Sequence, residues 1–409
     1  MEKAVTENNR QAWKVLISAM IVQLFLGIVY VWGVFVIPVS EMFSWNVEAV
    51  KLTASFKLGF FVFGMIIGGK MQVRMCASRV VLAGGLMGGV GLLVASFTPI
   101  AVPWLLYVTY GVICGFGSGM GYIASITAAQ KWFPKRRGFA TGLCVGAFGL
   151  SVTIFAPVIE WLLATLALRT TLHIMSAAFF VVTLLLGRLV KFPEETPAAA
   201  AVASNKPQYT SGQMLRKKEF YLITISLLLI TGGFFVINPA VQTLSVYRGF
   251  DLGFATILLM IVGASNAFGR IVIPIFSDRV GNERMVLILT VVTMLAAFTL
   301  IFATGPLFVV MVALIPICFG AALSVFPLIT ADYFGIKNLG SNYGMVTIGF
   351  AFSALVLPGL ISLLGGYSVR FIAVTALAAA GIVVILALIR MKKKADAEEL
   401  EKAEAKPAE

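Results

Sequence analysis

Arg270 is the residue whose position in this sequence most directly implies binding chemistry. It lies in the apolar segment ASNAFGRIVIPIFSD, eight residues before Asp278, a separation of about 12 Å along a helix. An arginine this deep in an apolar helix costs roughly 2.5–3.5 kcal/mol or more unless it faces a cavity or a partner. A guanidinium also matches a carboxylate through two parallel hydrogen bonds. The pattern indicates an anion site, with a structural arginine satisfied by backbone carbonyls as the alternative.

The rest of the sequence offers Arg270 no acidic partner. All 18 Asp and Glu residues fall in loops or near the ends of the expected helices. This favours an anionic ligand as the partner and weakens any proton relay through a buried carboxylate. Asn266 lies one helical turn earlier on the same face, where it could orient the guanidinium or contact a ligand.

Neither a metal site nor an enzymatic site is indicated. His173 is the only histidine, and Cys76, Cys114, Cys144 and Cys318 form no CxxC pair. No nucleophile and base are suitably placed within the apolar segments. We therefore expect no metal, no cofactor and no enzymatic activity.

Lys57 is a second cation within an apolar segment, and two interpretations of it remain open. Its stem could carry the ammonium outward to the surface. Alternatively, Lys57 could face a cavity and supply a second positive charge or a titratable group. Elsewhere, Asn238 precedes Pro239, which should interrupt its helix, so Asn238 is a further candidate for a pocket.

Long apolar segments must position these side chains. The chain is 60% hydrophobic and 12% charged, against roughly 25% charged in soluble domains, and about 20 apolar residues cross a bilayer as a helix. The sequence predicts an all-α membrane protein with twelve transmembrane helices, at 15–38, 50–70, 80–98, 103–130, 139–162, 170–190, 220–246, 253–276, 285–304, 306–332, 342–365 and 369–390.

Charge placement predicts the topology. With the N-terminus in the cytoplasm, 25 of the 31 Lys and Arg residues lie on the cytoplasmic side. Four lie on the other side (Lys51, Arg169, Arg248 and Arg370), while Lys57 and Arg270 lie within spans. Such a bias places both termini in the cytoplasm. The net charge of +13 is thereby explained by topology, and we expect no nucleic-acid binding.

A polar linker at 191–219 divides the chain into six spans before it (1–190) and six after it (220–390), followed by a charged cytoplasmic tail (391–409). The halves repeat weakly, because the pairs Arg74/Arg79 and Arg279/Arg284 have equal spacing and lie 205 residues apart. Two parallel six-helix repeats are typical of the major facilitator architecture, with a substrate site between the halves.

Several segments resemble the oxalate/formate antiporter family, the bacterial relatives of the monocarboxylate transporters. They are WFPKRRGFATG, FGIKNLGSNYG, SGQMLRKKEF and the Asn-x-x-x-Arg pair followed by SDRVG. The resemblance implies a major facilitator fold in a bacterial inner membrane and transport of small carboxylates. It also implies that Arg270 binds the carboxylate and that Tyr30 and Tyr122 belong to the site. The position of the lysine that binds the second carboxylate of oxalate is Phe350 here, which favours a monocarboxylate.

We therefore predict a monomeric transporter that moves a lactate- or pyruvate-like acid across the lipid bilayer by alternating access, with proton coupling left open. A dicarboxylate or organic-anion antiporter that uses Lys57 and Arg270 is the alternative, and a carboxylate-binding membrane sensor is a remote one. The expected substrate site comprises Arg270, Asn266, Tyr30, Tyr122, Asn238, Phe350 and Lys57, and the expected gate comprises Asp278, Arg279 and Arg74.

Overall fold

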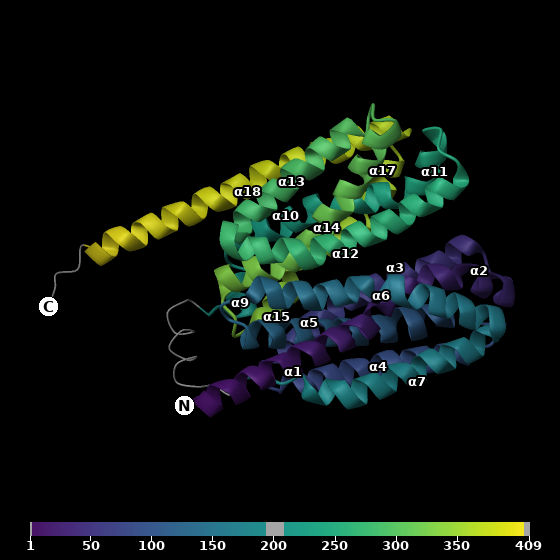
Figure 1. The fold of residues 1–409 in the computed structure, drawn as a ribbon, viewed down its shortest axis with the longest axis horizontal. Coiled ribbons are helices and arrows are strands. Elements are labelled where there is room, and N and C mark those ends of the chain that lie inside the picture. Colours follow the sequence, from purple (N-terminus) through teal and green to yellow (C-terminus); the bar gives the residue numbers. More distant parts are fainter. Residues whose placement is uncertain (1, 194–207, 405–409) are drawn as a thin grey trace.

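The computed structural model describes residues 2–193 and 208–404, and these residues form two helical bundles that lie side by side (Figure 1). Both described chain ends lie at the same end of the molecule, called the terminal end below, and the opposite end is called the distal end (Figure 1). The predicted linker at 191–219 falls partly outside the described residues.

The N-terminal bundle contains the first six passages. Its helices pack α3 against α5 and α4 against α7. The elements are α1 (Glu2–Leu26), η1 (Gly27–Val31), α2 (Trp32–Phe43), α3 (Val47–Met71), α4 (Ala77–Ser96), η2 (Tyr107–Cys114), α5 (Gly115–Trp132), α6 (Arg137–Thr165), α7 (Leu168–Leu186) and η3 (Gly187–Leu189).

The C-terminal bundle contains the remaining passages. Here α12 packs against α14, and α18 packs against α10 and α13. The elements are α9 (Ser211–Met214), α10 (Lys218–Ile237), η4 (Asn238–Ala240), α11 (Val241–Tyr247), α12 (Leu252–Val280), α13 (Asn282–Thr299), α14 (Gly305–Phe334), α15 (Leu339–Val346), α16 (Ile348–Leu355), α17 (Leu357–Ser362) and α18 (Tyr367–Glu404).

The observed helices follow the predicted spans, although several spans are divided and the first is not a long apolar helix. Among the described residues, 11 helices are long and apolar enough to cross a membrane. The span predicted at 15–38 is not one such helix, because it is divided into α1, η1 and α2. These three elements nonetheless run in sequence from the terminal end to the distal end (Figure 1).

Three irregular segments, η1, η2 and η4, interrupt the long helices of the described residues. At η1, Gly27 packs on α6 so closely that a Cβ there would lie 2.2 Å from the Phe148 carbonyl oxygen. At η4, Pro239 lacks the N–H needed to continue α10, and the predicted interruption is confirmed. At η2 the backbone widens to a π-helix, a feature that often marks a functional site.

The two bundles meet most closely toward the terminal end. Gly69 of α3 lies against the backbone of α15, where a Cβ would lie 2.1 Å from the Gly340 carbonyl carbon. Toward the distal end, Gly59 of the same helix would reach only Leu355, at 3.7 Å. The bundles diverge toward α2 and α11 at that end (Figure 1). This conformation is therefore closed at the terminal end.

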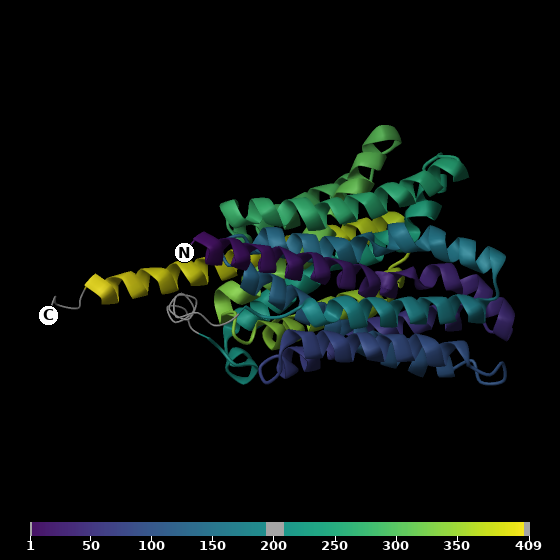
Figure 2. The same cartoon turned by 60° about the horizontal axis from the view of Figure 1, so that its bottom comes forward.

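The last helix continues well beyond the bundle. Its 38 residues run through the charged tail to Glu404, and both views show it projecting past the other helices (Figures 1 and 2). Lys392 forms an ion pair with Glu283 at the start of α13. The charged tail is thus helical up to Glu404.

Candidate functional site

Arg270 and Asn266 form a pair on α12, as their spacing predicted. The Arg270 side chain is 1% exposed, and its Nε donates a hydrogen bond to Asn266 Oδ1 at 2.8 Å. This bond uses one of the five N–H groups of the guanidinium. Asn266 therefore fixes the orientation of the plane and leaves the outer nitrogens available for other acceptors.

Backbone from two neighbouring helices surrounds the rest of the Arg270 side chain. Its Nη1 donates to the Val145 carbonyl of α6 at 3.4 Å. A Cβ at Gly149 of α6 would lie 2.8 Å from Arg270 Cδ, and a Cβ at Gly320 of α14 would lie 3.1 Å from Arg270 Cγ. Glycine at both positions gives the side chain its space at the contact of the two bundles.

No carboxylate neutralises this guanidinium in the described part of the chain. The ion pairs found there are Lys51–Glu48, Arg137–Asp332 and Lys392–Glu283. A buried charge is costly unless it is paired and hydrogen-bonded. One side-chain oxygen and one long backbone contact leave Arg270 suited to an anion that supplies two oxygens.

The two predicted tyrosines lie on the N-terminal side of this group, linked through Phe148. The Arg270 guanidinium carbon lies 5.8 Å from the centre of the Tyr30 ring, within cation–π range. Tyr30 contacts Phe148 edge to face at 5.3 Å, and Tyr122 does so at 4.8 Å. Tyr30 belongs to η1, the 3-10 helical segment of the first passage.

Phe350 belongs to an aromatic cluster in the C-terminal bundle. It is 4% exposed and contacts Phe235 and Phe319 at 5.5 and 6.4 Å between ring centres. Phe319 directly precedes Gly320, the residue that packs on the Arg270 stem. Along α14, the cluster is therefore one residue away from the contact with the Arg270 stem.

Asn238 and Lys57 lie away from the immediate surroundings of Arg270. Asn238, at the helix break η4, lines a cavity of about 10 Å³ that also includes Val262, one turn before Asn266. Lys57 does not extend outward to the surface, because it is 1% exposed. Its Nζ lies 3.6 Å from the centre of the Tyr110 ring, inside the N-terminal bundle.

The polar contacts that join the bundles lie at the terminal end. Both carboxylate oxygens of Asp278 accept from the backbone N–H of Gly138 at 3.0 Å, near the start of α6, where the helix dipole favours an anion. Arg137 also forms an ion pair with Asp332 of α14 at 2.6 Å. The other predicted gate residues, Arg279 and Arg74, are exposed.

The sequence did not predict the Arg137–Asp332 ion pair, nor the hydrogen bond from Asn282 that also holds Asp332. Asn282 donates to Asp332 Oδ2 at 2.6 Å, and it accepts from Ser277 at 2.5 Å. Arg137 ends the basic run KRR after the fourth passage, whereas Asp332 lies in the last turn of α14. No sequence signal joins these two residues, because they do not occupy equivalent positions of the repeat.

The sequence and the fold both have known counterparts. The sequence profile of the Major Facilitator Superfamily matches residues 15–331 and 223–409. An uncharacterized MFS-type transporter of Escherichia coli (strain K12), YhjX, is 27% identical over 357 residues, covering 85% of this chain and 87% of the relative. Monocarboxylate transporter 13 of Rattus norvegicus is 28% identical over 398 residues, covering 92% and 88%.

A third relative and a solved structure extend the comparison. The oxalate:formate antiporter of Oxalobacter formigenes is 26% identical over 362 residues, covering 85% of this chain and 84% of the relative. The crystal structure of the transporter FucP in the outward conformation superposes with a TM-score of 0.70 at 14% identity, covering 91% of this chain and 98% of that one. The similarity to FucP concerns the fold alone.

Proposed function

Because this chain belongs to the major facilitator superfamily and is a multi-pass secondary transporter rather than an enzyme, we propose that it carries a small monocarboxylate such as pyruvate or lactate. One observation carries the proposal: Arg270 is buried where the bundles meet, and no acid pairs with it among the described residues. A carboxylate supplies the missing charge and two acceptor oxygens.

The geometry suggests a role for each surrounding residue. Asn266 holds the Nε edge of the guanidinium, so the carboxylate binds through the outer nitrogens. Tyr30 and Tyr122 close the N-terminal side through Phe148. Phe350 and its aromatic neighbours accommodate the apolar remainder of the acid. Asn238 lies apart from these residues, beside the small cavity at η4.

Transport follows from rocking the two bundles about this buried charge. The charge bias of the sequence supports a cytoplasmic location of the terminal end, and on this assignment the closed end faces the cytoplasm. Asp278 and the Arg137–Asp332 pair hold it closed. Opening to the cytoplasm breaks these contacts and exposes the carboxylate. The protein then acts as a monomer in the inner membrane, with 1–190 and 220–390 as its two moving parts.

Exchange of organic anions is the second candidate function. It is favoured by the similarity to a protein named an oxalate:formate antiporter. The position of Lys57 argues against a dicarboxylate held between both cations, because Lys57 and Arg270 contact different rings, Tyr110 and Tyr30. The apolar cluster around Phe350 also offers nothing to a second carboxylate.

Counterflow of labelled pyruvate in proteoliposomes tests the proposal, with thermal stabilisation by pyruvate as a binding assay. Arg270→Gln should weaken binding by at least tenfold, since a hydrogen bond to a charged group contributes about 1.5–3 kcal/mol. Arg248→Gln is a matched control, because Arg248 donates to the carbonyls of Leu300 and Ile301. Equal pyruvate binding by wild type and Arg270→Gln would overturn the proposal. Faster counterflow of oxalate than of pyruvate would favour the exchanger.

A further inference from the structure

An open cavity of about 460 Å³ lies between the two bundles at the terminal end. The N-terminal bundle contributes the end of α3 and the turn after it, and the C-terminal bundle contributes α9 and the start of α15 (Figure 1). We call this cavity the boundary groove. None of the residues that surround Arg270 lines it. Its lining residues are Ile67, Lys70, Met71, Val73, Arg74, Thr210, Ser211, Asn338 and Ser341.

The wall formed by the N-terminal bundle carries positive charge that no acid balances. Lys70 and Arg74 follow each other by about one turn, and both are exposed. Neither takes part in an ion pair among the described residues. Val73, which lies between them, is apolar and 51% exposed, and no Asp or Glu lines the groove. The two cations are therefore available to an anion.

The wall formed by the C-terminal bundle presents hydroxyl groups and a helix N-terminus. The hydroxyls of Ser211 and Ser341 share a hydrogen bond, and Thr210 lies beside them. Asn338 is the N-cap residue of α15, but its amide donates to the Tyr209 carbonyl and does not cap the helix. The helix dipole favours negative charge at this end of α15. Both walls of the groove therefore suit a phosphate ester.

An apolar strip leads from the groove along the exposed face of α3. Phe63 and Ile67 are 58% and 40% exposed. They precede Lys70 and Arg74 at intervals of three or four residues, so all four side chains share one face of the helix. Because α3 is long and apolar enough to cross a membrane, acyl chains cover this strip and the two cations lie at the level of the headgroups. The molecule that matches this face is an amphiphile with an anionic head.

We propose that the boundary groove binds the headgroup of an anionic phospholipid, such as phosphatidylglycerol, and that the bound lipid stabilises the conformation closed at the terminal end. The phosphate lies between Lys70 and Arg74 and accepts from the hydroxyls of the opposite wall. The acyl chains lie along Phe63 and Ile67. Basic pockets between membrane helices bind anionic headgroups in this way. A soluble phosphate ester has the same charge but leaves the apolar strip unused.

Lipid binding is linked to the conformation because the two walls of the groove belong to different bundles. Gly69 of α3 and Gly340 of α15 are in backbone contact beside the groove. Separation of the bundles at this end moves Lys70 and Arg74 away from Ser341. A ligand that contacts both walls favours the state that brings them together, by the ratio of its affinities for the two states. The lipid therefore holds this end closed from the side of the bilayer.

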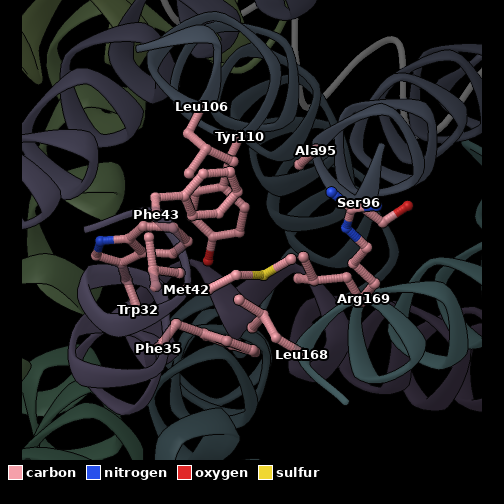
Figure 3. A pocket seen from close by; sticks show the side chains of 12 residues that line it. Trp32, Phe35, Met42, Phe43, Ala95, Ser96, Leu106, Tyr110, Leu168 and Arg169 are labelled. Carbon is pink, nitrogen blue, oxygen red and sulfur yellow. The ribbon is translucent and has the colours of Figure 1, made fainter. Parts of the chain in front are cut away.

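Two other cavities among the described residues do not combine these properties. A small cavity near the distal end of the N-terminal bundle, into which the Tyr110 hydroxyl points (Figure 3), has a volume of about 10 Å³, close to the minimum for one water molecule. Arg169, which lines it, donates to the Thr98 carbonyl. A cavity at the terminal end is lined by cations and acids in equal number, namely Lys135, Arg137, Lys392, Asp278, Glu283 and Asp332.

Binding of phosphatidylglycerol to the purified protein tests the proposal, with phosphatidylcholine of the same acyl chains as the neutral lipid. Native mass spectrometry counts the bound lipid, and a thermal-shift assay measures stabilisation. The double substitution Lys70→Gln and Arg74→Gln should weaken phosphatidylglycerol binding roughly 25-fold, at about fivefold for each cation. Arg10→Gln with Lys14→Gln is the matched control and should bind like wild type, because it removes an exposed pair with the same spacing on α1 of the same bundle.

Glycerol phosphate distinguishes a lipid from a soluble phosphate ester, because it carries the anionic head without acyl chains. It should stabilise the wild type less than phosphatidylglycerol does. Ile67→Ser should weaken binding of the lipid and leave the response to glycerol phosphate unchanged. Equal stabilisation by the two compounds in wild type would identify a soluble ester as the ligand and overturn the lipid assignment.

Pulsed electron spin resonance in nanodiscs tests the effect on conformation, with spin labels at the exposed positions Arg79 and Arg279. Replacing phosphatidylcholine by phosphatidylglycerol should lower the long-distance population in wild type, but not in the variant that lacks both groove cations. The proposal is overturned if the wild-type distribution does not respond, if that variant responds or binds like wild type, or if the control pair loses binding equally. None of these measurements requires a carboxylate, so the proposed function stands or fails independently.

Discussion

Replacing Gly69 by alanine should open the terminal end of the transporter. A Cβ at this position would lie 2.1, 2.2 and 2.3 Å from Gly340 C, Ser341 N and Gly340 O. All three atoms are backbone of α15, so no side chain can turn away to make room. The closed state must separate the helices or strain them, whereas the open state loses the contact altogether.

The size of the effect follows from the cost of overpacking, about 1–3 kcal/mol. Since about 1.4 kcal/mol is a factor of ten in an equilibrium constant, the ratio of open to closed molecules should rise by roughly 5- to 150-fold. Gly59→Ala on the same helix is the matched control, because its Cβ would meet only Leu355, at an ordinary 3.7 Å.

Pulsed electron spin resonance measures this shift directly. Spin labels at the exposed positions Arg79 and Arg279, one on each bundle at the terminal end, report the separation in a variant without native cysteines. Gly69→Ala should increase the population at long distance, and Gly59→Ala should leave the distribution unchanged. An unchanged distribution in Gly69→Ala, or an equal change in both variants, would refute the reasoning.

Three further predictions concern the site and the latch. Gly149→Ala should displace the Arg270 side chain, since its Cβ would lie 2.8 Å from Arg270 Cδ, and pyruvate should then stabilise the purified protein less in a thermal-shift assay; undiminished stabilisation would contradict the site. Asp332→Asn should weaken the partly buried pair with Arg137 and raise the long-distance population in the spin-label assay, whereas a tighter terminal end would exclude a latch role. Phe350→Lys should lower the thermal stability by placing an unpaired cation in an aromatic cluster, and oxalate should restore it by binding beside Arg270; no response to oxalate would show that Phe350 does not face the site.

The sequence was informative wherever the chemistry was local. The Asn266–Arg270 spacing of one turn predicted a shared face, and the hydrogen bond between them confirms it. Apolar length predicted the passages, and Pro239 predicted the break at η4. Each of these depends on helix geometry within a few residues.

The parts that could not be predicted depend on contacts between distant segments. Arg137 and Asp332 lie 195 residues apart, and no local pattern pairs them. The direction of Lys57 was open because α3 is apolar around most of its circumference, so its sequence does not show which face meets η2. The π-helical form of η2 could not be predicted, because its sequence contains no proline and no pair of glycines that would indicate an irregular helix.

The projecting end of α18 is a helical extension that should move together with the C-terminal bundle. The segment from Lys392 to Glu404 extends about 18 Å at the helical rise, and the ion pair of Lys392 with Glu283 joins its base to α13. A fluorescent domain fused in helical register would therefore turn with the C-terminal bundle. Fluorescence anisotropy or energy transfer to a dye on the N-terminal bundle would then follow single transport cycles, with no label inside the transport path.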